Sequence, residues 1–112
     1  MKKLFLILTL LLTVIPMGAV GQRDNIPITK VRVDRSGLVT IDFSANATQY
    51  GTPPACATVT NRMTADSNTA GGKAILQAAL TAYLSGRQVY LEGTGTCSEF
   101  STLESINILQ LH

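Results

Sequence analysis

The chain has 112 residues with no tryptophan, a single histidine and only two cysteines. The histidine, His112, is the last residue, where we expect it to be frayed and solvated. Metal sites of ordinary composition and Ser/His/Asp or Cys/His catalytic arrangements need a positioned imidazole, so the sequence favours neither a metal nor an enzyme. Cys56 and Cys97 form no CxxC pair, which argues against a zinc or redox site. No glycine-rich stretch matches a phosphate-binding motif, and no cofactor is expected.

Charge is sparse as well, with nine Lys or Arg and seven Asp or Glu. Two of the nine are Lys2 and Lys3, so the chain after residue 21 carries seven of each sign and is formally neutral. A neutral chain lacks the basic surface that nucleic acid requires, and we expect no nucleic-acid partner. Glu92, Glu99 and Glu104 are candidates for an acid/base pair, but their interpretation as exposed surface carboxylates is favoured.

The N-terminal segment is typical of an export signal. Lys2 and Lys3 precede an apolar run over residues 4–15, Pro16 ends it, and Ala19 and Gly21 supply small residues before a cleavage point. An apolar run this short cannot cross a bilayer, because a transmembrane helix needs about 20 residues. The sequence therefore predicts a signal over residues 1–21, a single domain over 22–112, and a secreted or periplasmic location with no membrane span after processing.

The two cysteines are predicted to form a disulfide, because the exported chain meets an oxidising compartment and a domain of this size gains much from a crosslink. A bridge between Cys56 and Cys97 closes a loop and restricts the unfolded chain. The lost chain entropy stabilises the folded state by about 4 kcal/mol.

Hydrophobic periodicity predicts five strands and one helix. The strands are expected over residues 28–34, 38–44, 55–65, 87–93 and 103–111. The helix is expected between a cap at Thr69 or Asn68 and Leu84, with Gly86 ending it. Residues 22–27 are predicted as an irregular lead-in and 45–54 as a loop. Four further expectations concern side chains: Phe43 and Tyr83 lie in the core, Ile106 and Ile108 point inward, Leu109 and Leu111 face a second layer, and Tyr90 points outward.

The order strand, strand, strand, helix, strand, strand favours a mainly β fold with one helix. It is the order of the OB-fold, a five-stranded, partly open Greek-key barrel. An open α+β sheet with the helix packed across one face buries the same residues and is the alternative.

Three short stretches carry a family resemblance. They are Pro54-Ala55-Cys56, the helix over residues 74–84 with Gln77, Ala78 and Tyr83, and Ser85-Gly86-Arg87-Gln88-Val89. Together they resemble the secreted OB-fold binding subunits of subtilase-type and pertussis-like bacterial toxins, and also small uncharacterised secreted proteins of Gram-negative bacteria. The resemblance implies an oligomeric ring with a glycan-binding face. No glycan-contact motif of that family is matched here, so no site residue is transferred.

The favoured function is a small secreted, non-enzymatic binding module for a glycan or a protein surface, with a homo-oligomer as one form. The alternative is a secreted or periplasmic structural or inhibitory partner protein with no small ligand. Tyrosine offers an apolar face and a polar tip, which suits sugar or protein contacts. The candidate contact residues are Tyr50, Arg62, Tyr90 and Phe100.

Overall fold

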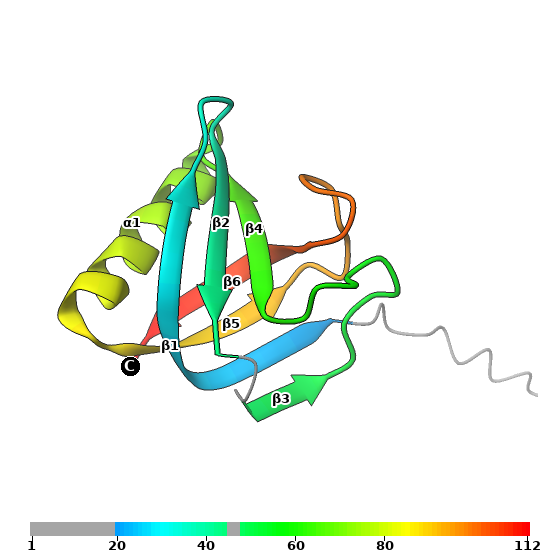
Figure 1. Ribbon diagram of the computed structural model, residues 1–112, viewed down its shortest axis with the longest axis horizontal. Helices are drawn as coiled ribbons and strands as arrows, with labels where there is room; N and C mark the ends of the chain where they lie inside the picture. The colour runs from blue at the N-terminus through cyan, green and yellow to red at the C-terminus, as the bar shows by residue number, and fades with distance from the viewer. Residues whose placement is uncertain (1–19, 45–47) are drawn as a thin grey trace, which may run out of the picture.

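The computed structural model describes residues 20–44 and 48–112, which form a mainly β fold with one helix (Figure 1). The elements in chain order are β1 (Gly21–Val33), β2 (Leu38–Phe43), β3 (Thr48–Gly51), β4 (Arg62–Asp66), α1 (Ala70–Ser85), β5 (Gln88–Gly93) and β6 (Glu104–Leu111).

Five of the strands close into a ring. The hydrogen-bonded order is β2-β4-β6-β5-β1, and β1 also pairs with β2, which completes the circuit. All pairings in the ring are antiparallel except β4 with β6, which run parallel. The alternative of an open sheet is therefore wrong. Closure leaves β3 as an added strand on the N-terminal part of β1.

β1 bends, and this lets it pair with strands on both sides of the ring. Its N-terminal half pairs with β3 and β5, and its C-terminal half pairs with β2. The register shifts between Arg23 and Ile26 and again between Ile28 and Lys30. Asn25 lies at the first shift with a φ of 52°, a left-handed conformation that asparagine tolerates better than most residues. Such irregularities sharpen the local twist, which lets one long strand turn from one set of neighbours to another.

The core fills the inside of the ring with aliphatic side chains and Phe43. β2 shows the period-2 pattern most clearly, because Val39, Ile41 and Phe43 are buried and the residues between them are less so. The expected core position of Phe43 is confirmed. The buried apolar cluster contains Ile26, Ile28, Val39, Ile41, Phe43, Met63, Ala65, Ala79, Ala82, Val89, Leu91 and Ile106.

The helix α1 begins and ends where the sequence predicts. Thr69 is the N-cap, and its Oγ1 accepts a 2.9 Å hydrogen bond from the amide of Gly72. Gly86 closes the helix at φ 70°, a conformation that favours glycine. The helix packs against β1, β4 and β6 through the small buried residues Ala79 and Ala82.

Three predicted segments, a lead-in, a loop and a strand, differ from the structure. The predicted lead-in over 22–27 belongs to β1, and the predicted loop over 45–54 contains β3. The predicted strand over 55–65 is a strand only in β4, because residues 55–61 form turns and irregular backbone. Alternating small and apolar residues in that segment mimic a strand, but Pro53 and Pro54 just before it cannot donate to a ladder.

A bulge changes the inward set of β6. Glu92 pairs with Ile108 and Gly93 with Ile106, so Asn107 is an extra residue on β6. An extra residue reverses which side chains face inward. Ile106 is buried as expected, but Ile108 is 42% exposed, and that prediction is wrong. Leu109 and Leu111 instead pack against the core.

Candidate functional site

A groove lies on the outer face of β1, β2 and β4, under two loops. Its volume is about 180 Å³. The floor comes from the outward positions of the strands, and the wall comes from Val59, Phe100, Thr102 and Leu103 in the loops that follow β3 and β5. These loops lie on the same side of the sheet in Figure 1. The lining residues used below are Lys30, Arg32, Thr40, Asp42, Val59, Arg62 and Phe100.

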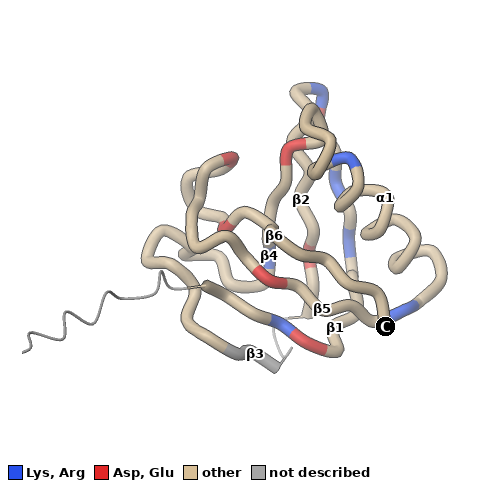
Figure 2. Tube along the Cα trace, turned by 180° about the vertical axis from the view of Figure 1, so that it is seen from behind, with Lys and Arg blue, Asp and Glu red and all other residues tan. Residues whose placement is uncertain are grey.

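The floor of the groove carries a row of alternating charge. Lys30 of β1 is the register partner of Asp42 of β2, and Asp42 is the partner of Arg62 of β4. Residues that face each other across neighbouring strands are close enough to interact. Basic and acidic residues are interspersed over the rest of the described chain as well (Figure 2).

Arg62 and Asp42 form a two-pronged ion pair. Arg62 Nε donates to Asp42 Oδ1 at 2.8 Å and Nη2 donates to Oδ2 at 3.1 Å. The carboxylate raises the pKa of Arg62 through these hydrogen bonds. The Asp42 side chain is 14% exposed and that of Arg62 is 41% exposed, so the pair sits at the surface of the floor.

The wall of the groove presents an exposed aromatic ring. Phe100 is 47% exposed and opens a short turn, in which the amide of Leu103 donates to the Phe100 carbonyl at 3.2 Å. Val59 from the other loop lies nearby, and its amide donates to the Thr102 carbonyl at 3.4 Å. The groove therefore combines an apolar wall with a floor of hydrogen-bonding side chains.

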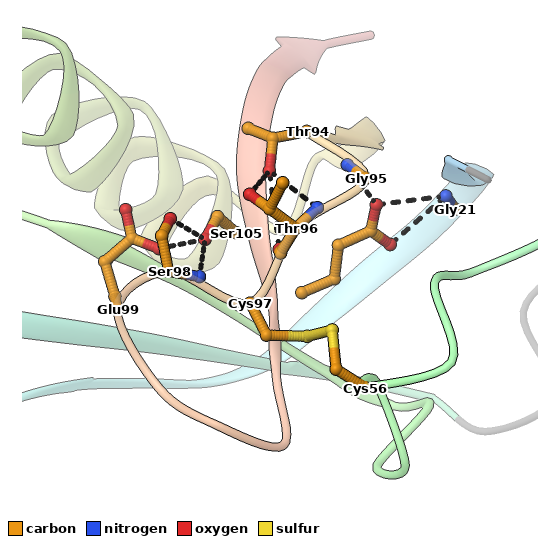
Figure 3. Close-up of a disulfide and its surroundings, with 10 residues drawn as sticks. Gly21, Cys56, Thr94, Gly95, Thr96, Cys97, Ser98, Glu99 and Ser105 are labelled. Atoms are coloured by element: carbon orange, nitrogen blue, oxygen red, sulfur yellow. Dashed lines mark hydrogen bonds between the residues drawn. A yellow bond between two sulfur atoms is a disulfide. The ribbon is translucent and has the colours of Figure 1, made fainter. Parts of the chain in front are cut away.

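The predicted disulfide is confirmed, and it joins the two wall loops (Figure 3). Cys56 and Cys97 are bonded at an S–S distance of 2.05 Å, with their Cα atoms 6.2 Å apart. Cys56 lies in a turn rather than at the start of a strand. The bridge therefore fixes the loop that carries Val59 against the segment that carries Phe100.

The structure brings together two of the four candidate contact residues. Arg62 and Phe100 both line the groove. Tyr90 lies on β5, outside the groove, half-buried, with its hydroxyl 3.4 Å from Glu92 Oε1. Tyr50 belongs to β3, where its backbone is paired with Gln22, but its side chain lies outside what the structure describes. Lys30 and Asp42 line the groove as well, and the sequence did not single them out.

Glu104 was expected at the surface, and this expectation is wrong. It is 3% exposed, and both of its oxygens lie 3.1 Å from the amide nitrogen of Gly21. Its Oε2 also accepts from the amide of Gly95 at 3.0 Å. Burial raises the pKa of Glu104. Glu99 is exposed as expected, and Glu92 is half-buried and accepts from Gln22 Nε2 at 3.0 Å.

Arg23 is the second buried charged side chain that the sequence did not reveal, at 5% exposure. Its guanidinium donates to the carbonyls of Gln22 and Thr60 at 3.1 and 3.2 Å. Its Cζ also lies 5.8 Å from the centre of the Phe43 ring. Burial lowers the pKa of Arg23. These contacts hold the Arg23 side chain inside the molecule.

His112 is tied down rather than frayed, which corrects the expectation. Its Nε2 lies 2.6 Å from Asp24 Oδ1, and its amide donates to the Gln88 carbonyl at 3.0 Å. Arg87 Nη1 donates to the His112 carbonyl at 2.8 Å. The role of these contacts is to hold the end of β6 beside β5 and β1.

The helix leaves apolar side chains uncovered. Leu80 is 39% exposed, Tyr83 47% and Leu84 80%. The predicted core position of Tyr83 is therefore wrong, because the helix face that packs on the core carries Ile75, Leu76, Ala79 and Ala82 instead. Large exposed apolar side chains that neighbour one another mark surfaces for partners more often than isolated ones do.

Comparison with known proteins gives no further assignment: no protein-family model matches the chain, and no curated protein matches it. Among residues 20–44 and 48–112, no three His, Cys, Asp or Glu side chains gather as a metal would require. In the same part of the chain, no helix is long and apolar enough to cross a membrane.

Proposed function

We propose that this chain is a small exported, non-enzymatic binding module that recognises a glycan in the groove on β1, β2 and β4. The observation that carries the proposal is the exposed Phe100 ring beside the charged row of Lys30, Asp42 and Arg62. Sugars have apolar C–H faces that suit an aromatic ring, and hydroxyls that pair with charged, two-pronged groups. The disulfide is compatible with a secreted or periplasmic location.

The size of the groove limits the ligand. Its volume of about 180 Å³ is below the usual range of roughly 300–1,000 Å³ for drug-sized molecules. The module therefore takes one terminal sugar unit rather than the length of a chain. Weak single-site binding of this kind gains strength when several copies act together, which favours a homo-oligomer.

An OB-like barrel is part of the same proposal. It is supported by the closed five-stranded ring, by its single parallel pair between β4 and β6, and by the helix between β4 and β5. The resemblance of residues 54–92 to the binding subunits of secreted bacterial toxins supports a glycan ligand in addition. The fold itself carries no function, so the groove residues are the main support.

A glycan array probed with the purified, oxidised protein tests this function, followed by titration calorimetry with the best binder. Phe100→Ala should weaken binding roughly fivefold or more, because stacking of an aromatic ring on a ligand contributes about 1–3 kcal/mol. Tyr83→Ala is the matched control, since Phe100 and Tyr83 are both 47% exposed. Absence of binding on the array, or equal losses in the two variants, would contradict the proposal.

The exposed helix face favours a second candidate, a partner protein with no small ligand. A partner that covers Leu80, Tyr83 and Leu84 would bury apolar surface now in contact with water. Light scattering and crosslinking with a co-purified partner would test it. Under this second candidate the glycan array should show no binding, and Leu84→Lys should abolish the association with the partner, which separates the two candidates.

A further inference from the structure

One flank of α1 carries four residues at the spacing of a helix–helix contact. They follow one another at intervals of three, four and three residues, which places them in one stripe along the helix. We call this stripe the α1 seam, and its residues are Lys73, Leu76, Leu80 and Tyr83. Figure 1 shows α1 at the rim of the molecule, with no described element beyond it.

The α1 seam runs beside the buried side of the helix rather than along it. The buried residues of α1 are Gly72, Ala79 and Ala82. Successive residues of a helix turn by about 100°, so the middle of the seam lies about a quarter turn from them. Leu80 and Tyr83 are accordingly 39% and 47% exposed, and Leu76 is half-buried against the core. The fold of a single chain therefore leaves apolar surface of the seam in contact with water.

Charge is almost absent from α1, and the one charge lies at the unfavourable end. Lys73 is the sole charged residue among the 16 of the helix, and it is the fourth of them. The first turn contains no acidic residue and the last turn no basic one. The backbone amides at the start of a helix are partly positive and the carbonyls at its end partly negative. The helix thus carries a cation near its positive end and none at its negative end.

A second copy of the helix, laid antiparallel along the seam, corrects both ends. The N-terminal turn of each helix then lies beside the C-terminal turn of the other, so Lys73 reaches the second copy's Tyr83 and its last carbonyls. Leu76 meets the second copy's Leu80 in the middle. A parallel arrangement would instead bring the two Lys73 ammonium groups together, which like-charge repulsion disfavours.

We propose that the α1 seam is a dimer interface, on which a second copy of this chain docks with its helix antiparallel. A two-fold contact must be self-complementary. The seam meets this condition, because its two leucines lie in the middle, with a cation at one end and an aromatic ring at the other. The helix of 16 residues is about 24 Å long, so the contact is small and the dimer is weak and reversible.

The dimer is independent of what the groove binds. None of the four seam residues lines the groove, so the affinity of one groove for one ligand does not depend on the dimer. Failure of the dimer would leave the proposed function standing, and failure of glycan binding would leave the dimer standing.

The first test is the mass of the exported, oxidised protein by sedimentation equilibrium. Over a dilution series from about 1 mM to 1 µM, the mass should fall from that of two chains to that of one. A single chain at every concentration overturns the proposal. An assembly of more than two chains also overturns it, because a two-fold contact closes on itself.

The second test exchanges the two ends of the seam. Tyr83→Lys places two like charges against each other, and because this happens twice in the dimer, the Kd for dimerisation should rise at least about tenfold. Adding Lys73→Tyr to this variant restores one cation and one ring at each end, so the dimer should return. A different protein bound to this face would not be recovered by the exchange. A Tyr83→Lys variant that dimerises like wild type, or a double variant that stays monomeric, overturns the proposal.

Lys73→Glu separates dimerisation from folding. A carboxylate in the first turn favours the helix of the monomer, but in the dimer it lies against the partly negative end of the other helix. Ala74→Glu is the matched control, because Ala74 is exposed in the same turn and lies outside the seam. Lys73→Glu alone should raise the Kd for dimerisation, and neither variant should lower the Tm of dilute protein. Equal dimerisation of the two variants overturns the proposal.

Discussion

The guanidinium of Arg62 donates two hydrogen bonds to the carboxylate of Asp42, at 2.8 and 3.1 Å. The pair bridges β4 and β2 on the floor of the groove. Exposed ion pairs of this kind contribute little to stability, typically about 0–1 kcal/mol. The Arg62–Asp42 pair is therefore a suitable place to test the proposed glycan recognition separately from stability.

Replacing Arg62 of this ion pair should weaken binding of the proposed glycan and leave stability unchanged. In Arg62→Lys the charge is kept but the second hydrogen bond is lost, so affinity for the glycan should fall about tenfold, or about 1.4 kcal/mol. The Tm should hardly change. Calorimetric titration and thermal melting measure the two effects, and Arg32→Lys, in the same groove but without a forked pair to Asp42, is the control. A large loss of Tm with unchanged affinity would reverse this assignment.

Removal of the disulfide should destabilise the domain and loosen the groove. The crosslinked cysteines are 41 residues apart, and a loop of that size is valued at about 4 kcal/mol. Since whole domains are stable by only about 5–15 kcal/mol, Cys56→Ala/Cys97→Ala should be marginally folded. Urea unfolding of the double variant, and of wild type with and without reductant, measures the loss. An unchanged urea midpoint would mean that the disulfide contributes nothing to the stability of the domain.

Two glycines should respond oppositely to alanine. In Gly93→Ala the new Cβ meets the end of Glu104, which cannot move away because the Gly21 and Gly95 amides hold it. We expect a loss of about 1–3 kcal/mol, the range for overpacking. A Cβ added to Gly71 in α1 would meet nothing within 4 Å, and Gly71→Ala should gain about 0.5–1 kcal/mol. Urea unfolding of both variants measures these changes; a neutral Gly93→Ala would show that Glu104 is free to move.

The contact between Asp24 and His112 predicts a dependence on pH. The hydrogen bond from His112 lowers the pKa of Asp24 below its ordinary value of 3.8. The folded chain then holds this proton less tightly than the unfolded chain, so the contact stabilises the fold above pH 3.8 and this contribution is lost as the pH falls through the lowered pKa. Wild type should therefore melt above Asp24→Asn at about pH 5, and the two should converge in stronger acid. The same difference in Tm between wild type and Asp24→Asn at every pH would contradict this prediction.

Features governed by neighbouring residues could be predicted from the sequence. The cap at Thr69 and the stop at Gly86 depend on local backbone chemistry, and both are confirmed. The pairing of Cys56 with Cys97 followed from there being two cysteines and an export signal. The alternation around Val39, Ile41 and Phe43 is the direct signature of a half-buried strand.

Features governed by distant residues could not be predicted. Gln22, Arg23 and Asp24 look like a polar lead-in, and only their pairing with the distant strands β3 and β5 makes them part of β1. Glu104 looks like any surface carboxylate until Gly21, at the other end of the chain, is placed beside it. The sequence indicated two groove residues, Arg62 and Phe100, by their type. It did not indicate the row of alternating charge that Lys30 and Asp42 form with Arg62.

The bend in β1 has a consequence for unfolding. One strand completes the ladder on both sides of the ring, so neither side retains a closed sheet once β1 detaches. Tyrosine fluorescence, reporting on β3, α1 and β5, and far-ultraviolet circular dichroism, reporting on the whole backbone, should then trace a single superimposable transition, as expected of an all-or-none cooperative unit.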